Sequence, residues 1–490
     1  MTLEASRPVA LAARLAGEPT AAFEHLFARR TVLIRLAPEV ATSVPMREAA
    51  LLAVNAILRF CPNVTLALPS AAMDVADSAR ELARAIHGDE AVLATCAIDQ
   101  ADVEPFDAVL GVGRDLRAHH AWIAVDASGW CARVATSASG ANPLPPAHVP
   151  ANELAALAAA CLGVGQVFLA LVGRPLLANP LELSLFDLTT GAPGELDVGP
   201  ALPSSIELNA LLIGCGGVTN GFAYASARTD LTGRIEAVDK QSLRPENIGP
   251  YVCVTQARLG MPKAEVIRDV LAPNIDVIPR NERFRFFLAR IGRGQTSVPP
   301  IVIAGLDDER VRHDVQRLWA PLTIDLAAEE LTAQVIVKDL DDDGVCLLGA
   351  YRVDAGTPDE LDELAASLGL SRDRVADFES EITADDVASA PPEKRTALEE
   401  ARRRGQRVCG RATGLDLSEE EPSSEFTPAI PFVTTFSGVV GAAQTTRRIL
   451  GVGEGSLHFQ FSFLSYRGRK MRMRCVSDCE CQVRRGRAAA

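Results

Sequence analysis

The chain has 490 residues, enough for about three domains of ordinary size, or for two large domains with an inserted module. Hydrophobic residues make up 48% and charged residues 23% of it, which excludes a long disordered chain, a collagen-like fibre and a small disulfide scaffold. Its 63 acidic and 49 basic side chains leave a net charge of −14. We therefore expect no nucleic-acid partner, because such a protein neutralises phosphates with excess positive charge.

The sequence favours a cytoplasmic protein with reduced thiols. Its N-terminus lacks the pattern of a secretory signal, and the 11 cysteines lie singly before a cluster at 475–481, which indicates buried thiols, a nucleophile or a metal rather than a disulfide framework. Residues 154–173 carry no charge over a length that could span a bilayer. They are dominated by Ala and Gly and contain Gln166, so we favour a fully buried helix over a membrane span and expect no membrane partner.

Short apolar runs alternate with helical patterns, which predicts parallel sheets covered by helices. In the first half the alternation runs from Thr31, and in the second half the same order restarts near Glu207. The predicted elements of the first half are 31–37, 45–59, 63–69, 74–88, 91–97 and 107–113, and those of the second half include 208–214, a helix after Val218, 233–239, 262–274, 276–284, 299–308 and 333–340.

The likeness of the two halves extends to late apolar segments at 142–173 and 428–451. We predict an α/β fold with two Rossmann-like domains, the first over 1–200 and the second over 201–351 with 427–490. Residues 352–426 read as a helical insertion, because helical patterns at 359–370 and 391–405 precede an acidic loop.

The sharpest local motif is a buried strand that runs into Gly214, Gly216 and Gly217 and then into a helix. Glycines at such a turn let backbone N–H groups approach phosphates, and the helix N-terminus adds partial positive charge. A nicotinamide site requires a third glycine at position 219, where this chain has Thr219. The nicotinamide hypothesis therefore loses one of its supports.

Polar residues follow the next predicted strands. Asp239 ends a strand where a carboxylate can bind ribose hydroxyls, although it could equally be a loop aspartate. Lys263 begins a helix, where a phosphate partner would explain a cation that opposes the helix dipole; a solvated lysine is the alternative. Asp307 could hold Mg²⁺ with phosphates, or Asp307 or Asp308 could cap a helix. With Asn247, these residues and the glycines predict a nucleoside triphosphate site at the carboxyl ends of parallel strands.

These motifs resemble the ThiF, MoeB and HesA family, whose superfamily includes the ubiquitin-activating enzymes. The resemblance covers residues 206–350 and 428–451, while the first 200 residues are similar only in element order, like the inactive adenylation half of those enzymes. It implies an adenylyltransferase that uses ATP and Mg²⁺ to activate the C-terminal carboxylate of a ubiquitin-like protein. It also implies that Asp239 binds the ribose, Lys263 the phosphates and Asp307 the metal.

One departure from the family pattern lies at Pro250, where the family usually has an arginine that contacts the γ-phosphate. We expect another arginine to replace it: either Arg244, or Arg29 or Arg30 from the first half. The remaining family positions are present, so we favour a retained adenylation activity.

The resemblance also implies roles for cysteines. Related enzymes often carry zinc on two Cys-x-x-Cys pairs, but here Cys346 lacks the second thiol of its pair. Two interpretations stay open: a structural Zn²⁺ site, or a C-terminal segment with reduced cysteines. An acyl-accepting thiol is expected at Cys409, which follows an arginine-rich helix inside the insertion. The candidate zinc ligands are Cys346, Cys475, Cys479 and Cys481.

The leading hypothesis is thus ATP-dependent activation of a ubiquitin-like protein, thioester formation on Cys409, and transfer to a partner that resembles ubiquitin-conjugating enzymes. Bacterial proteins of this kind are associated with antiviral defence. The alternatives are adenylation of a peptide or small-molecule carboxylate, and a non-catalytic scaffold with a decayed ATP site. A duplicated chain could act as a monomeric pseudodimer or form a homodimer.

Overall fold

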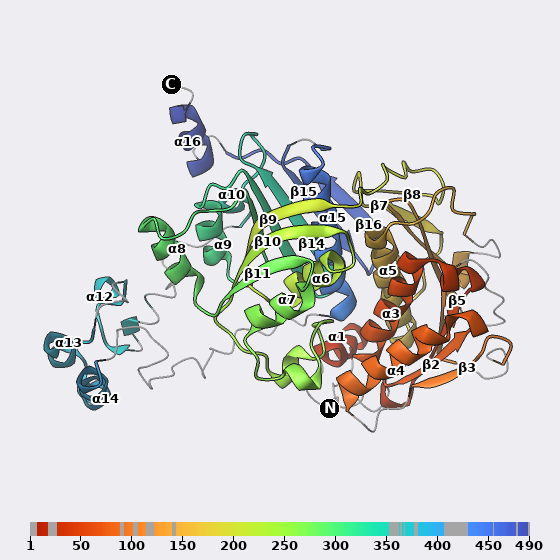
Figure 1. Ribbon diagram of the computed structural model, residues 1–490, viewed down its shortest axis with the longest axis horizontal. Coiled ribbons are helices and arrows are strands. Elements are labelled where there is room, and N and C mark those ends of the chain that lie inside the picture. Colours follow the sequence, from red (N-terminus) through yellow and green to blue (C-terminus); the bar gives the residue numbers. More distant parts are fainter. Residues whose placement is uncertain are drawn as a thin grey trace. The chain divides into compact units, whose positions relative to one another are not determined.

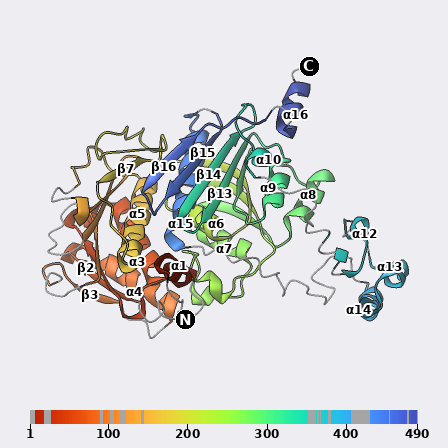
Figure 2. The same cartoon turned by 180° about the vertical axis from the view of Figure 1, so that it is seen from behind.

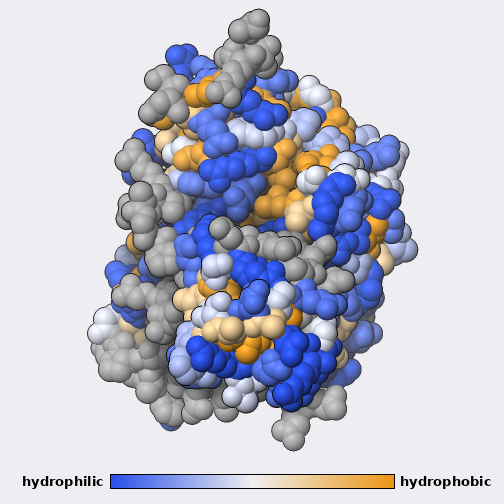
Figure 3. Space-filling model, turned by 90° about the vertical axis from the view of Figure 1, so that its left-hand side faces the viewer, coloured by the Kyte–Doolittle hydropathy of each residue, from blue (hydrophilic) through white to orange (hydrophobic). Residues whose placement is uncertain are grey.

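A computed structural model shows the chain as two compact units, one formed by 1–351 with 427–490 and the other by 352–426. Each unit is described by itself. Hydrophilic residues dominate the face of the protein in Figure 3, with smaller hydrophobic areas between them. The structure describes residues 7–17, 27–88, 93–100, 106–113, 122–139, 144–351, 362, 365–366, 368–376, 381–405, 430–453, 455–476 and 479–488.

The first half of the larger unit contains an eight-stranded sheet in the order β3-β2-β1-β4-β5-β6-β7-β8 (Figure 1). The strands from β3 to β5 are parallel, and those from β5 to β8 are antiparallel. The elements are α1 (Arg7–Ala16), β1 (Thr31–Leu36), α3 (Val44–Leu58), β2 (Asn63–Leu68), α4 (Met73–His87), β3 (Ala94–Ala97), β4 (Ala108–Val112), β5 (Trp122–Ser128), β6 (Cys131–Thr136), α5 (Glu153–Leu171), β7 (Leu181–Ser184) and β8 (Thr189–Gly191).

The second half contains another eight-stranded sheet, in the order β11-β10-β9-β12-β13-β14-β15-β16. Its strands from β13 to β16 are labelled in Figure 2. Its strands are parallel from β11 to β13 and antiparallel from β13 to β16. The elements are β9 (Ile206–Ile213), α6 (Gly217–Ser226), β10 (Leu231–Val238), α7 (Lys263–Leu271), β11 (Ile275–Arg280), α8 (Phe284–Gly292), β12 (Ile301–Ala304), α9 (Glu309–Gln316), β13 (Leu322–Glu329), β14 (Thr332–Asp339), α10 (Leu347–Ala350), α15 (Pro431–Ile449), β15 (Leu457–Ser462), β16 (Arg467–Met471) and α16 (Glu480–Ala488).

The two sheets therefore have the same strand order, and the predicted α/β fold with two Rossmann-like sheets is confirmed. Strands β4 and β12 are buried throughout, as expected for parallel strands covered by helices on both faces. Two predicted strands are longer than the observed ones. The strand expected over 276–284 ends at Arg280, and α8 begins at Phe284. The strand expected over 299–308 spans only Ile301–Ala304.

Helix α5 is long and apolar enough to cross a membrane, yet 94% of its most apolar window is buried inside the protein. Asn152 caps its N-terminus by accepting a hydrogen bond from the backbone N–H of Ala155, at 2.8 Å. This is the buried core helix that the sequence favoured. The composition of the helix follows from burial on all sides, because neighbours approach it closely only where side chains are small.

The two halves of the larger unit share one hydrophobic core. The rings of Phe168 on α5 and Phe432 on α15 lie 5.6 Å apart, and the Tyr466 hydroxyl donates a hydrogen bond to the carbonyl of Leu162, at 2.6 Å. A Cβ on Gly165 would lie 2.6 Å from the ring of Phe463, so this glycine permits the close approach. The two halves are thus in close contact through buried side chains of one core.

The smaller unit contains helices α12 (Arg372–Ala376), α13 (Ala384–Ser389) and α14 (Pro392–Arg403). A small core of its own includes Val375 and Leu398. Arg374 pairs with Asp386 at 2.7 Å. The candidate nucleophile Cys409 lies outside the described residues.

Candidate nucleotide-binding site

The candidate site lies where three neighbouring parallel strands, β10, β9 and β12, reach their carboxyl ends. Figure 1 labels β9 and β10. Strand β9 leads into the glycine loop, residues 214–217, and then into α6. Asp239 follows β10 directly, and Asp307 follows β12. Because β10 and β12 flank β9 on opposite sides, their connections diverge here and leave the crevice in which open α/β sheets bind ligands.

The conformation of the glycine loop depends on glycine at two positions. Gly214 has a φ of +78°, and a Cβ there would lie 2.4 Å from the carbonyl oxygen of Gly305. A Cβ on Gly305 would in turn lie 2.6 Å from Cγ2 of Thr219. A side chain at either Gly214 or Gly305 would therefore push the glycine loop away from the connection after β12.

Thr219 stabilises the glycine loop, although it stands where nicotinamide enzymes have a glycine. Its hydroxyl donates hydrogen bonds to the carbonyls of Gly214, at 2.8 Å, and Gly216, at 3.1 Å. The close approach that nicotinamide enzymes obtain with a third glycine on the helix is supplied here by Gly305 on the neighbouring connection. Gly216 is the N-cap residue of α6 and has no capping side chain, so no N-cap side chain occupies the first N–H groups of α6.

Asp239 holds the glycine loop to the end of β10. Its carboxylate accepts a hydrogen bond from the N–H of Cys215, at 2.7 Å, and another from the N–H of Gln241, also at 2.7 Å. A carboxylate has about four acceptor positions, so these two bonds leave acceptor capacity for hydroxyl groups of a ligand.

Lys263 begins α7 and is only 7% exposed. Its ammonium donates a hydrogen bond to Oε1 of Gln241, at 2.6 Å, and lies 5.5 Å from the ring centroid of Tyr251. Burial by itself lowers the pKa of Lys263, but the interactions with Tyr251, including a hydrogen bond, and with the carboxylates of Asp239 and Asp307 outweigh it, and the pKa is raised above its ordinary 10.5. The ammonium therefore stays charged and lies within the field of both candidate carboxylates.

The two aspartates after β12 have different environments. Asp308 is the N-cap residue of α9 and accepts a hydrogen bond from the N–H of Arg310, at 2.8 Å. Asp307 is exposed and its charge acts on Lys263. The helix-capping alternative thus applies to Asp308, and Asp307 stays the candidate ligand for a metal.

Asn247 ends a short 3-10 turn, Pro245–Asn247, and Arg244 is the N-cap residue that precedes it. The Oδ1 atom of buried Asn247 accepts a hydrogen bond from the N–H of Arg244, at 2.9 Å, so the asparagine shapes this turn. Arg244 is exposed. The carbonyl of Pro250 accepts a hydrogen bond from the hydroxyl of Thr434, at 3.0 Å, while Arg30 of the first half pairs with Asp107.

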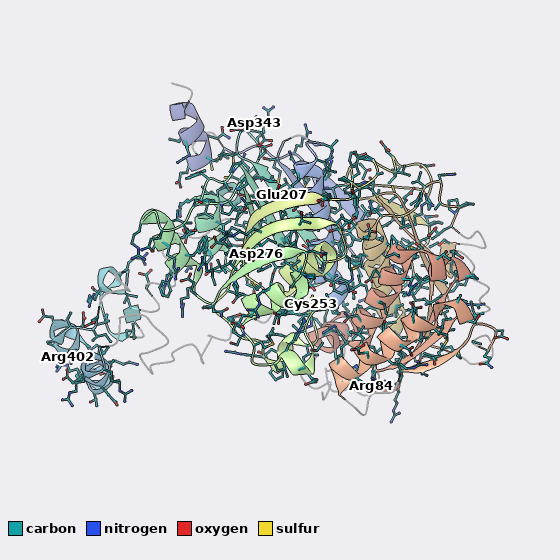
Figure 4. All side chains as sticks on the ribbon, in the orientation of Figure 1. Arg84, Glu207, Cys253, Asp276, Asp343 and Arg402 are labelled. Atoms are coloured by element: carbon teal, nitrogen blue, oxygen red, sulfur yellow. The ribbon has the colours of Figure 1, made fainter. Side chains whose placement is uncertain are left out.

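The first half of the chain holds the loop at 245–254, which carries Tyr251. The buried guanidinium of Arg59, the residue directly after α3, donates hydrogen bonds to the carbonyls of Val252, at 2.9 Å, and Val254, at 3.1 Å. The same loop carries Cys253, labelled in Figure 4, whose thiol donates a hydrogen bond to the carbonyl of Asn220 on α6, at 3.4 Å. The loop is therefore fixed from both halves.

Sequence reasoning missed two side chains of this site, Gln241 and Tyr251. Both contact Lys263, yet both lie in a connection without regular structure, where spacing gives no indication of direction. Their position after the Asp239 motif is the one signal that could have drawn attention to them.

Four cysteines come together beside α10 and α16. Their sulfur atoms lie within 4.8 Å of one another, and four of the Sγ–Sγ distances are 3.3 to 3.4 Å. A disulfide requires about 2.05 Å, whereas thiolates around zinc, each about 2.3 Å from the metal, lie about 3.8 Å apart. The cluster fits a tetrahedral metal with a small expansion. Its members are Cys346, Cys475, Cys479 and Cys481.

Three comparisons relate the chain to known proteins. Residues 31–185 match the family model described as the BilD N-terminal domain. The chain is 25% identical over 254 residues to the uncharacterized protein y4jF of Sinorhizobium fredii, a stretch that is 50% of this chain and 47% of the relative. The chain thus spans about half the length of that curated relative.

Solved structures of similar fold include Escherichia coli MccB with ATP, at 14% identity over 56% of this chain and 67% of that chain, with a TM-score of 0.36. The microcin C7 biosynthetic enzyme MccB in complex with N-formylated MccA is 13% identical, over 57% and 68%, with a TM-score of 0.36. PaaA is 14% identical over 56% and 65%, with a TM-score of 0.33. Likeness at these levels concerns the fold and carries no argument about residues or substrates.

Proposed function

We propose that this protein is an adenylyltransferase that binds ATP at the glycine loop and activates a carboxylate. The observation that carries the proposal is the buried, charged ammonium of Lys263, which lies within the field of Asp239 and Asp307 and whose own charge acts on Cys215 of the glycine loop. A cation with a raised pKa, backbone N–H donors and an exposed carboxylate are the groups that a nucleoside triphosphate with its metal requires.

In the proposed reaction a substrate carboxylate oxygen attacks the α-phosphorus of ATP, pyrophosphate leaves, and an acyl adenylate forms. Lys263 and the N–H groups of the glycine loop would bind phosphate oxygens and stabilise the charge that develops on them, an effect of a few kcal/mol for each well-placed donor. Asp239 would accept hydrogen bonds from the ribose. Mg²⁺, held by Asp307, would neutralise phosphate charge while it is bound.

For the substrate we propose the carboxylate of a peptide or small molecule. This reaction needs only the groups gathered around Lys263. Activation of a ubiquitin-like protein with transfer to Cys409 and then to a conjugating partner is the second candidate; it rests on the family resemblance, and its nucleophile lies outside the described residues. We retain the proposals that the first half is an inactive adenylation-like domain and that the four-cysteine cluster holds a structural Zn²⁺.

ATP binding is the first test, because it requires no second substrate. We expect calorimetric titration with a non-hydrolysable ATP analogue and Mg²⁺ to show binding, and Lys263→Ala to weaken it about tenfold to a hundredfold, since one charge-assisted contact is lost. Lys394→Ala, in the smaller unit, is the matched control and is expected to bind like wild type. A wild-type protein that binds no ATP analogue would leave only the scaffold alternative.

The second test identifies the substrate by exchange of labelled pyrophosphate into ATP. A peptide or small carboxylate that supports exchange in the absence of any ubiquitin-like protein favours the first candidate. Exchange that requires a ubiquitin-like protein favours the second, and a reducible adduct that disappears in Cys409→Ala would then assign the acyl-accepting thiol. Exchange that persists unchanged in Lys263→Ala would contradict the proposed site.

A further inference from the structure

A second polar pocket lies at the other end of α15, away from the glycine loop. It has a volume of about 290 Å³ and is lined by residues from the last turn of α15, the loop that follows, and strands β15 and β16. Three of its five lining residues are cations. The lining consists of Arg447, Gly453, Leu457, Lys470 and Arg472.

Arg447 is held in place without a full complement of partners. Its guanidinium lies 4.9 Å from the ring centroid of Phe186 and 3.9 Å from the carboxylate of Asp187. Its side chain is 13% exposed, and within the part of the chain that the structure describes its Nε atom has no hydrogen-bond partner. A buried guanidinium nitrogen of this kind is costly unless a ligand or water satisfies it.

The loop after α15 is shaped around this guanidinium. Gly453 has a φ of +121°, and a Cβ there would lie 3.0 Å from Cζ of Arg447, so glycine lets the backbone approach the arginine face. The neighbouring Arg448 donates a hydrogen bond to the carbonyl of Gly453, at 3.0 Å, and fixes the loop from the other side. The pocket wall is therefore set by the fold and not by a freely moving surface loop.

The pocket concentrates positive charge on a chain with a net charge of −14. Burial lowers the pKa of both Arg447 and Lys470, and the charge of Arg447 lowers that of Lys470 further. Asp187 offsets part of the charge, since its carboxylate faces Arg447 and its carbonyl accepts a hydrogen bond from Lys470, at 2.9 Å. Three cations against this one carboxylate leave an excess of two positive charges.

The pocket is distinct from the candidate nucleotide site. Thr434, near the start of α15, packs against the glycine loop, since its Cγ2 lies 3.1 Å from where a Cβ on Gly217 would be. Arg447 lies about 13 residues further along the same helix, a rise of about 20 Å. One ligand of nucleotide size at the glycine loop would not fill this pocket.

We propose that this pocket binds a phosphate group, either inorganic phosphate or the phosphate monoester of a small molecule. Two guanidinium groups and an ammonium provide the planar and point-charge donors that phosphate oxygens accept. An excess of two positive charges matches the charge of about −1.5 to −2 that a phosphate monoester carries near neutral pH. The proposal is independent of the nucleotide site and does not require the protein to adenylate a substrate.

The test is calorimetric titration of the full-length protein with inorganic phosphate, with glycerol phosphate and with acetate at matched ionic strength. We expect both phosphates to bind and acetate to bind more weakly. Tighter binding of glycerol phosphate would identify a small-molecule monoester as the ligand, and tighter binding of inorganic phosphate would identify the free ion. Acetate that binds as tightly as either phosphate would overturn the proposal.

Variants locate the binding. Lys470→Met and Arg472→Ala change exposed side chains of the pocket, and each is expected to weaken phosphate binding about tenfold or more. Arg467→Ala lies on β16 outside the pocket lining and is the matched control, and Lys263→Ala removes the cation of the nucleotide site; neither is expected to weaken phosphate binding at the pocket. The proposal is wrong if the two pocket variants bind phosphate like wild type, or if Lys263→Ala alone abolishes the signal.

Discussion

Replacing Arg59 by methionine tests whether the first half of the chain supports the candidate site. Arg59 is fully buried, and its guanidinium donates hydrogen bonds to Oδ1 of Asn55, at 2.8 Å, and to the carbonyl of Ile248. Two further bonds reach the carbonyls of Val252, at 2.9 Å, and Val254, at 3.1 Å. Methionine keeps much of the side-chain volume but leaves these acceptors without their donor.

The expected loss follows from the hydrogen bonds that the variant removes. A hydrogen bond in a folded protein contributes about 1 kcal/mol after the cost of removing its groups from water, so the four bonds of Arg59 contribute about 4 kcal/mol. Burial lowers the pKa of Arg59 from 12.5 to about 9, because desolvation disfavours the charged form. We therefore expect Arg59→Met to lower the free energy of unfolding by about 4 kcal/mol.

Urea unfolding followed by tryptophan fluorescence measures this loss in the right part of the protein, because Trp122, Trp130 and Trp319 all lie in the larger unit. Arg59→Lys keeps a charge but not the planar fork, so we expect an intermediate loss. The Arg59→Met variant is also expected to bind the ATP analogue more weakly, since Tyr251 lies in the loop that Arg59 holds. A loss below about 0.5 kcal/mol, the range of ordinary surface substitutions, would refute the reasoning.

Three further predictions concern other parts of the fold. Gly305→Ala places a Cβ 2.6 Å from Cγ2 of Thr219 and is expected to lower stability by about 1–3 kcal/mol and to weaken ATP binding; wild-type behaviour would show that the two connections can separate freely. Cys346→Ser is expected to abolish a stoichiometric Zn²⁺ content measured by metal analysis of the purified protein, and equal zinc in variant and wild type would contradict the four-thiolate site. Burial lowers the pKa of His458 below its ordinary value of 6.5, so the unfolded chain takes up a proton at this residue more readily than the folded protein. The free energy of unfolding is therefore expected to fall as the pH drops below 6.5. In urea unfolding, His458→Gln is therefore expected to lose less stability on acidification than wild type, and an equal loss would rule out this group as a source.

The parts of the fold that the sequence predicted share a clear physical signal. Strand β12 is apolar throughout and β9 ends in the buried apolar run 210–213, because helices cover both faces of a parallel sheet. The same topology brings Asp239 and Asp307 to one edge of the sheet, because parallel strands end on the same side. Their positions could thus be inferred from order along the chain, while their roles toward ATP stay predictions.

The antiparallel strands were harder to predict. Strand β8 has only three residues, and β16 has the sequence RGRKM, which is largely exposed, so neither gives an apolar pattern. Gly305 makes the close approach for which nicotinamide enzymes use a glycine at position 219. The sequence could not predict this, because the two residues lie in connections that are distant along the chain. The role of Arg59 could not be predicted from the sequence either, since an arginine near the end of a predicted helix ordinarily extends into solvent.

The shared core of the two halves has a consequence for how the protein can be regulated. Phe168 and Phe432 belong to helices from different halves of one chain, so the supporting half is always present at a ratio of one to one with the half that carries the glycine loop. Dilution cannot dissociate the two halves, because they belong to one chain. A defective first half cannot be replaced by an intact first half from another molecule. Specific activity that stays constant across protein concentrations is the signature expected of such a covalently paired arrangement.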